Sequence, residues 1–148
     1  MAERPAAADT APELVPFFES CSVGRLTIPR CVACGEYRWP PRPLCLLCGS
    51  SLFEWHEVAS YGRVYSWTTT HRSPSVDFAG TVPFTIVVVT LESAANVRMV
   101  GRLVSPSPGV ETDLSGLSAG ARVRARFERL ESPHVNVAWE LVRPDTEG

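Results

Sequence analysis

Two short cysteine motifs constrain the fold of this 148-residue chain more than any other feature. Residues 31–35 and 45–49 each read CxxCG, and ten residues separate the inner cysteines of the two motifs. A tight turn of this type presents two thiolates, and two such turns supply the four soft ligands of a tetrahedral zinc ion. The four expected ligands are Cys31, Cys34, Cys45 and Cys48. Because four cysteines leave no coordination position for water, we expect a structural rather than a catalytic zinc.

Disulfide and redox chemistry are the alternatives for these cysteines. The first residues contain no apolar signal core, so we expect a cytoplasmic chain, in which disulfides are disfavoured. Two symmetric motifs outside a βαβ pattern also argue against a redox CxxC site. The fifth cysteine, Cys21, falls on an expected helix and fits a small buried residue.

Charge and hydropathy argue against two classes of partner. The chain has 14 basic and 16 acidic side chains, a formal charge of −2, and every basic residue is arginine. A nearly neutral charge argues against general attraction to nucleic acid or to a membrane surface. The longest apolar stretch, residues 82–91, is shorter than the about 20 residues that span a bilayer. We therefore expect no membrane association.

The N-terminal region predicts a short amphipathic helix, because apolar residues recur at helical spacing after Pro12. Pro16 is tolerated only if the helix begins late, and Gly24 is a plausible end. The expected organisation is a disordered tail at 1–11, a helix within 12–28, a zinc ribbon at 29–54, a barrel at 55–143 and a tail at 144–148.

The second half of the chain is rich in β-branched and aromatic residues, with turn-like segments between the apolar runs. In the first segment, strict alternation places Val64 on one face and both Tyr65 and Trp67 on the other. With no long helix between the strands, a five-stranded OB barrel is the economical fold, since closing a sheet removes its edges. The expected strands are residues 61–70, 84–91, 97–104, 122–129 and 135–142, the second and third forming a hairpin.

These motifs together resemble the zinc-ribbon and OB-fold family known as domain of unknown function 35. The similarity covers roughly residues 12–143 and departs from the family in two places, Phe18 in place of Trp and the turn at 59–62. The resemblance implies a mainly β chain with an N-terminal docking helix, a rubredoxin-like four-cysteine ribbon and an OB barrel. The matching elements are Phe17-Phe18, Gly24-Arg25-Leu26, CxxCG followed by Trp39-Pro40-Pro41, CxxCGS, Phe53-Glu54-Trp55, the strand from Gly62 to Thr68, Val82-Pro83-Phe84, and Leu117 to Gly120.

The resemblance also implies a function. Family members bind thiolase-like proteins to form thiolases, acyltransferases or retro-aldolases that act on acyl-CoA, and the nucleophile usually lies in the partner. We therefore expect a non-catalytic accessory subunit that forms a heteromer and helps enclose a CoA thioester. The sequence agrees with this expectation, since we find no nucleophile elbow, HExxH motif or phosphate-binding glycine loop.

Candidate contacts lie in the loops and on the helix. Arginine suits the phosphates of CoA, and Trp, Tyr and Arg are enriched at protein interfaces. The expected ligand-binding residues are Arg38, Arg42, His71, Arg72 and Phe78, and the expected partner contacts are Phe17, Phe18, Tyr37 and Trp39.

Two other functions remain open from the sequence. A single-stranded nucleic-acid module would use an arginine stripe at Arg122, Arg124 and Arg126 with stacking aromatics on the first strand. We do not favour it, because alternating charge is common on a solvated strand face. A pure protein-protein adaptor that never meets CoA is the other alternative.

Overall fold

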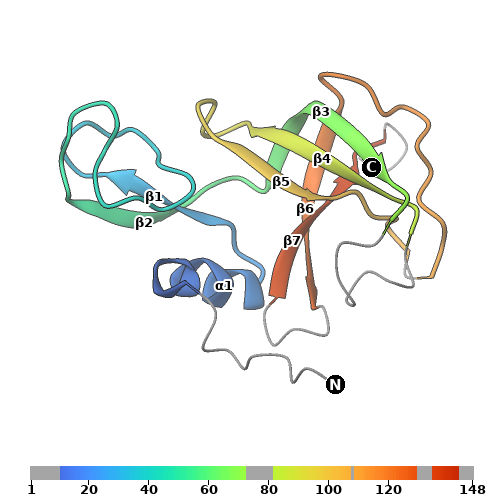
Figure 1. Ribbon diagram of the computed structural model, residues 1–148, viewed down its shortest axis with the longest axis horizontal. Coiled ribbons are helices and arrows are strands. Elements are labelled where there is room, and N and C mark those ends of the chain that lie inside the picture. The colour runs from blue at the N-terminus through green and yellow to red at the C-terminus, as the bar shows by residue number, and fades with distance from the viewer. Residues whose placement is uncertain (1–10, 73–81, 108, 130–134, 144–148) are drawn as a thin grey trace.

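A computed structural model of the chain describes residues 11–72, 82–107, 109–129 and 135–143 (Figure 1). Both expected tails, apart from residue 11, lie outside these ranges, as does Phe78. The described chain contains a short N-terminal helix, a small two-stranded sheet and a separate five-stranded sheet. No helix in these ranges is long and apolar enough to cross a membrane.

The N-terminal helix begins late, as the proline positions predict. A 3₁₀ turn, η2 (Pro12–Leu14), leads into α1 (Val15–Ser22), so Pro16 falls in the first turn, where no intrahelical N–H bond is lost. Gly24 follows the helix with φ of +75°, a left-handed conformation that glycine adopts without strain. Phe17 and Cys21 are the buried residues of α1 and face the core.

Two strands frame the cysteine loops. β1 (Thr27–Cys31) and β2 (Phe53–Glu57) pair antiparallel, with Thr27 opposite Glu57 and Cys31 opposite Phe53. The sequence does not reveal these strands, because each has only five residues and β1 contains a proline. Their pairing closes the base of the ribbon and leaves both CxxCG loops at its far end (Figure 1).

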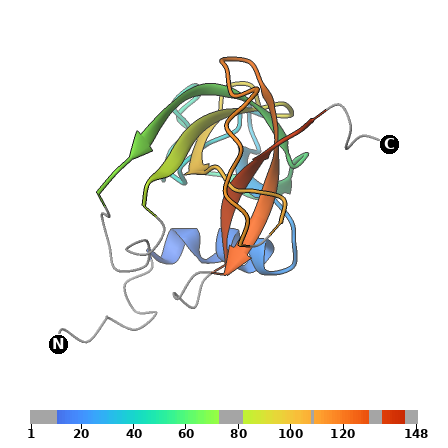
Figure 2. The same ribbon diagram turned by 90° about the vertical axis from the view of Figure 1, so that its right-hand side faces the viewer.

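The remaining strands form the expected OB-type barrel. They are β3 (Tyr61–Thr70), β4 (Phe84–Leu91), β5 (Arg98–Arg102), β6 (Arg122–Arg129) and β7 (Val135–Leu141). Their order is β5-β4-β3-β6-β7, and each neighbouring pair is antiparallel. A parallel bridge between Leu103 and Trp139 brings the two edges together, so the sheet is nearly closed. Figure 2 shows the curved sheet with α1 beneath it.

A β-bulge in β3 corrects the expected alternation. Val64 lies opposite Val89 and Trp67 lies opposite Val87, with the register shift between Val64 and Ser66. Because Val87 and Val89 point to the same side of β4, Val64 and Trp67 share a face, and the sequence prediction that separated them is wrong. The extra residue, Tyr65, is exposed and lies beneath the guanidinium of Arg98.

The core is continuous from the helix through the barrel. Phe17, Leu26 and Val58 belong to the same buried cluster as the inward side chains of the barrel strands. Trp139 on β7 is its largest fully buried member and packs against Gly101 on β5. A side chain at position 101 would occupy the space of the indole, so glycine is needed where the barrel closes.

We therefore expect Gly101→Ala to lower the free energy of unfolding by about 1–3 kcal/mol. A Cβ at this position would lie 2.8 Å from Trp139 Cδ1 and 3.0 Å from the carbonyl oxygen of Val137. Denaturant unfolding monitored by tryptophan fluorescence measures the change. Val100→Thr is the matched control, since Val100 is 61% exposed and should shift stability by less than about 0.5 kcal/mol. Equal stability of G101A and wild type would contradict the packing argument.

Candidate functional site

The four cysteines of the two CxxCG loops converge on one point. Their sulfur atoms all lie within 4.8 Å of one another, and the Cys31–Cys48 and Cys34–Cys45 pairs are each 3.6 Å apart. A tetrahedral ion with Zn–S bonds of about 2.3 Å requires sulfur-sulfur separations of about 3.8 Å. The donor set and its spacing therefore fit a structural zinc.

The two loops are near copies of each other in backbone hydrogen bonding. In the first, the Gly35 N–H donates to the carbonyl of Cys31 at 2.9 Å; in the second, the Gly49 N–H donates to Cys45 at the same distance. Gly35 and Gly49 have φ of +79° and +78°. A side chain at either position would be strained, so each glycine allows its loop to turn back and aim both thiols inward.

Backbone amides prepare the first thiol of each loop for ionisation. The N–H groups of Cys34 and Ala33, with smaller contributions from neighbouring thiols, lower the pKa of Cys31 to about 6. The amides of Cys48 and Leu47 likewise lower the pKa of Cys45. At Cys34 the Glu36 amide acts in the same direction, but desolvation and the three neighbouring thiols outweigh it and raise the pKa to about 12. A bound cation relieves this competition, because it stabilises all four thiolates together.

Arg38 holds the second loop in place from inside the ribbon. Its side chain is 6% exposed, and its guanidinium donates to the carbonyls of Arg42 at 2.8 Å and Ser50 at 3.3 Å. These two carbonyls lie on either side of the second CxxCG motif. The guanidinium carbon also lies 5.0 Å from the ring centre of Phe53. Arg38, expected to bind a ligand, is thus engaged in contacts within the chain.

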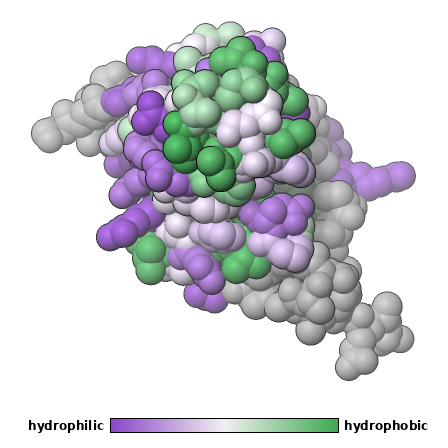
Figure 3. Space-filling model, turned by 90° about the vertical axis from the view of Figure 1, so that its left-hand side faces the viewer, coloured by the Kyte–Doolittle hydropathy of each residue, from purple (hydrophilic) through white to green (hydrophobic). Residues whose placement is uncertain are grey.

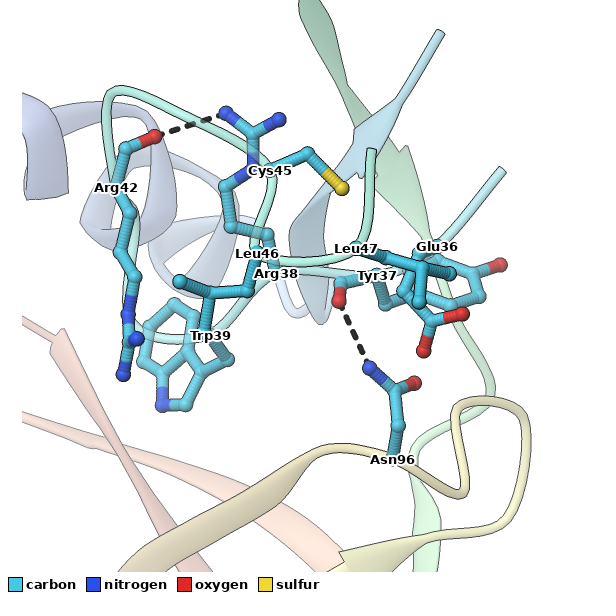
Figure 4. Close-up of a pocket in the computed structure, with 9 residues that line it drawn as sticks. All are labelled: Glu36, Tyr37, Arg38, Trp39, Arg42, Cys45, Leu46, Leu47 and Asn96. Atoms are coloured by element: carbon cyan, nitrogen blue, oxygen red, sulfur yellow. Dashed lines mark hydrogen bonds between the residues drawn. The ribbon is translucent and has the colours of Figure 1, made fainter. Parts of the chain in front are cut away.

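A pocket of about 420 Å³ lies where the ribbon meets the barrel (Figure 4). The Asn96 side-chain amide, on the turn between β4 and β5, donates to the carbonyl of Tyr37 at 2.8 Å and ties the two parts together. Arg42 and Trp39 lie at one end of the pocket in this view, and Tyr37 and Glu36 lie at the other. Its lining residues are Glu36, Tyr37, Arg38, Trp39, Arg42, Cys45, Leu46, Leu47 and Asn96.

The pocket brings together only some of the residues that the sequence nominates. Arg38, Arg42, Tyr37 and Trp39 line it, whereas His71 and Arg72 are exposed beyond the far end of β3, which extends away from the ribbon (Figure 1). The helix residues support the pocket from behind. Phe17 is 4% exposed with its ring centre 4.7 Å from that of Trp39, and Phe18 packs half-buried beside it.

Sequence reasoning missed four pocket residues, Glu36, Leu46, Leu47 and Asn96. The two leucines could have been found from the sequence, because an apolar pair inside an exposed CxxC turn indicates a contact surface. Leu46 and Leu47 are 82% and 70% exposed. Asn96 has no such signal, because its role depends on the barrel turn reaching Tyr37 across 59 residues of sequence.

The arginine stripe on β6 is paired with carboxylates. Arg122 donates to Glu92 at 2.9 Å, and Arg124 and Arg126 lie 3.1 Å and 3.3 Å from the same oxygen of Glu140. Glu140 is 4% exposed, and its hydrogen bond and charge raise the pKa of Arg124. This face is therefore largely neutralised within the chain.

Comparison with known proteins agrees with these observations. The chain matches family models for two domains of ChsH2, the rubredoxin-like zinc ribbon over residues 18–54 and the C-terminal OB-fold domain over residues 55–128. Fold and site thus define a zinc-ribbon protein with an OB domain. More particularly, the chain belongs to the ChsH2 family of DUF35 proteins.

Relatives of this chain include a scaffold protein and a probable enzyme subunit. A DUF35 domain-containing scaffold protein of Methanocaldococcus jannaschii is 30% identical over 103 residues, which are 69% of this chain and 67% of that protein. A probable enoyl-CoA hydratase alpha subunit of Thermomonospora curvata is 39% identical over 94 residues, 62% of this chain. The match spans only 28% of that subunit, so most of the subunit has no counterpart here.

Solved structures share the whole architecture. A chain of the Ltp2-ChsH2(DUF35) aldolase superposes with a TM-score of 0.74 at 28% identity, covering 93% of this chain and 98% of that one. A DUF35-family protein of unknown function from Sulfolobus solfataricus, at 15% identity, has a TM-score of 0.59 over 90% of this chain and 87% of its own, and shows the fold alone.

Replacing Cys31 or Cys48 with Ser should release the zinc, because an alcohol is a poor substitute for a thiolate ligand. Metal analysis of protein purified under reducing conditions should fall from one zinc per chain to well below one, while the β-sheet circular dichroism of the barrel persists. Cys21→Ala is the matched control. Cys21 is 1% exposed, burial raises its pKa to about 12, and it lies outside the cluster, so its loss should leave zinc content unchanged. Full zinc content in the two serine variants would contradict the assignment.

Replacing Arg38 with Met should loosen the ribbon without removing a metal ligand. Hydrogen bonds from a charged donor contribute about 1.5–3 kcal/mol each, so we expect faster zinc transfer to a chromogenic chelator. Arg42→Ala is a close control, because Arg38 contacts the main-chain carbonyl of Arg42, which this substitution retains. Equal release rates for R38M, R42A and wild type would contradict the bracing role of Arg38.

Proposed function

We propose that this protein is a non-catalytic accessory subunit that binds a thiolase-like partner and helps enclose a CoA thioester. The observation that carries the proposal is the match of ribbon and barrel together, over 93% of this chain, to a chain of the Ltp2-ChsH2(DUF35) aldolase. The relative named as a probable enoyl-CoA hydratase alpha subunit points to the same acyl-CoA chemistry. In this proposal the partner supplies the nucleophile and this chain supplies binding surface.

The pocket between ribbon and barrel supports a CoA contact. Arg42 is exposed beside the pocket, and its main-chain carbonyl accepts the Arg38 hydrogen bond, so this bond does not involve the Arg42 guanidinium. An arginine of this kind suits a phosphate group, while the indole of Trp39 offers a flat surface for an adenine ring. Leu46 and Leu47 provide an apolar wall for the less polar part of the cofactor. We therefore place the proposed contact here rather than at His71 and Arg72.

The nucleic-acid alternative receives less support. Single-strand binding depends on a cationic groove whose charges are available to phosphates. Arg122, Arg124 and Arg126 instead lie against Glu92 and Glu140, and the guanidinium of Arg98 covers the ring of Tyr65 at 3.7 Å. These contacts favour the accessory-subunit proposal over a polyanion-binding one.

Co-expression with a thiolase-like protein encoded by the same organism tests the proposal. We expect a stable heteromer on size exclusion, and turnover of a CoA thioester that neither protein shows alone. Tight, salt-dependent binding of single-stranded DNA by the isolated chain, with no heteromer, would overturn the proposal. A stable heteromer without any effect on CoA-thioester binding or turnover would favour the adaptor alternative.

Within the active complex, Arg42→Ala should raise the KM for the CoA thioester by about tenfold, the equivalent of one charge-assisted contact of about 1.4 kcal/mol. Arg72→Ala is the matched control, since Arg72 is also an exposed loop arginine but lies at the other end of β3. An increase caused by R72A and not by R42A would move the proposed contact to the loop after β3. Zinc content should remain one per chain in both variants.

A further inference from the structure

An apolar surface covers the far end of the zinc ribbon, and we refer to it as the knuckle tip. Residues 43–53 contain no charged side chain. Figure 3 views the molecule from the ribbon side and shows hydrophobic residues gathered over this part. The knuckle tip consists of Val32, Leu44, Leu46, Leu47, Leu52 and Phe53, which are 58%, 54%, 82%, 70%, 65% and 38% exposed.

The size of this surface points to an interface. The six side chains together expose on the order of 500 Å², comparable to the largest apolar patch of an ordinary monomer. A standard interface buries about 800 Å² on each partner, so the knuckle tip supplies more than half of one side. Pairing of two copies through this surface alone would fall short of that area. A larger partner that also contacts the neighbouring pocket rim would reach it.

The knuckle tip is continuous with the pocket and with the metal centre. Leu46 and Leu47 belong to both the tip and the pocket wall. Of the four thiols, Cys34 and Cys48 are exposed, whereas Cys31 and Cys45 are buried. A protein seated on the knuckle tip would therefore close over the pocket and shield the exposed zinc ligands at the same time.

We propose that the knuckle tip docks on an apolar face of the thiolase-like partner and that docking shields the zinc thiolates from solvent. This inference rests on the proposed function, and it adds the surface that makes the contact. Residues 43–53 contain no Asp, Glu, Lys or Arg that could form an ion pair with a partner, which favours an apolar partner face. The apolar contact excludes water, while Arg42 at the edge of the tip stays available to a bound phosphate.

The double variant Leu46→Ser and Leu47→Ser tests the docking surface. Both side chains point to solvent, so zinc content should stay at one per chain, while affinity for the partner in titration calorimetry should fall at least about tenfold. Val100→Ser is the matched control, because Val100 is 61% exposed on the outer face of the barrel. Affinity unchanged in the double variant, or lost equally in V100S, would overturn the proposal.

Zinc release provides a readout that is independent of activity. A saturating concentration of partner should slow transfer of zinc to a chromogenic chelator several-fold in wild type and not in the double variant. Equal transfer rates with and without partner would overturn the proposed shielding.

A wild-type chain that is dimeric alone and becomes monomeric in the double variant would assign the surface to a second copy instead. If no thiolase-like protein binds the wild-type chain, the proposed function is overturned, and so is the assignment of such a protein to the knuckle tip. If the heteromer forms and tolerates the double variant, only the docking surface is overturned.

Discussion

The packing of four thiols at one point, where they compete for ionisation, is the constraint on which the ribbon depends. Amide donors lower the pKa of Cys31 and Cys45, whereas desolvation and, after it, the three neighbouring thiols raise the pKa of Cys34 against its own amide donor. A divalent cation resolves this conflict and fixes the two loops relative to each other. Arg38 also helps to fix the second loop, since its guanidinium donates hydrogen bonds to carbonyls on both sides of that loop. The pocket wall formed by Leu46 and Leu47 is thus a consequence of metal coordination.

The barrel depends on a different physical effect, the burial of apolar side chains against a nearly closed sheet. Trp139 closes the barrel by filling the space that Gly101 leaves open. Phe17 belongs to the same buried core and packs against Trp39, which lines the pocket. Metal coordination and hydrophobic burial therefore meet at Trp39. A ligand in the pocket would contact one wall held by zinc and another held by the core.

The parts of the fold that the sequence predicts are those determined by local spacing. The zinc centre follows from the two CxxCG motifs, and the five barrel strands follow from runs of β-branched and aromatic residues separated by turn residues, which act over a few neighbouring positions. The helix start follows from Pro16, because proline restricts its own backbone and that of the preceding residue. Long-range contacts were not predictable in this way. The bulge at Tyr65 depends on how β3 pairs with β4. In the sequence Arg38 resembles an exposed loop arginine, and only the fold places it within hydrogen-bond distance of the carbonyls of residues 42 and 50.

The same distinction explains why the candidate site was only half visible. Tyr37, Trp39 and Arg42 lie close together in sequence, and their residue types indicate a binding surface. The opposite wall of the pocket comes from the second cysteine loop and from the barrel turn at Asn96. No single segment contains the pocket, because it forms where residues 36–42, the second cysteine loop and the barrel turn at Asn96 meet. In the proposed accessory role, this chain contributes to chemistry by contacting a ligand and a partner protein. It presents a preorganised surface whose shape is fixed before a partner arrives, which reduces the entropy lost on binding.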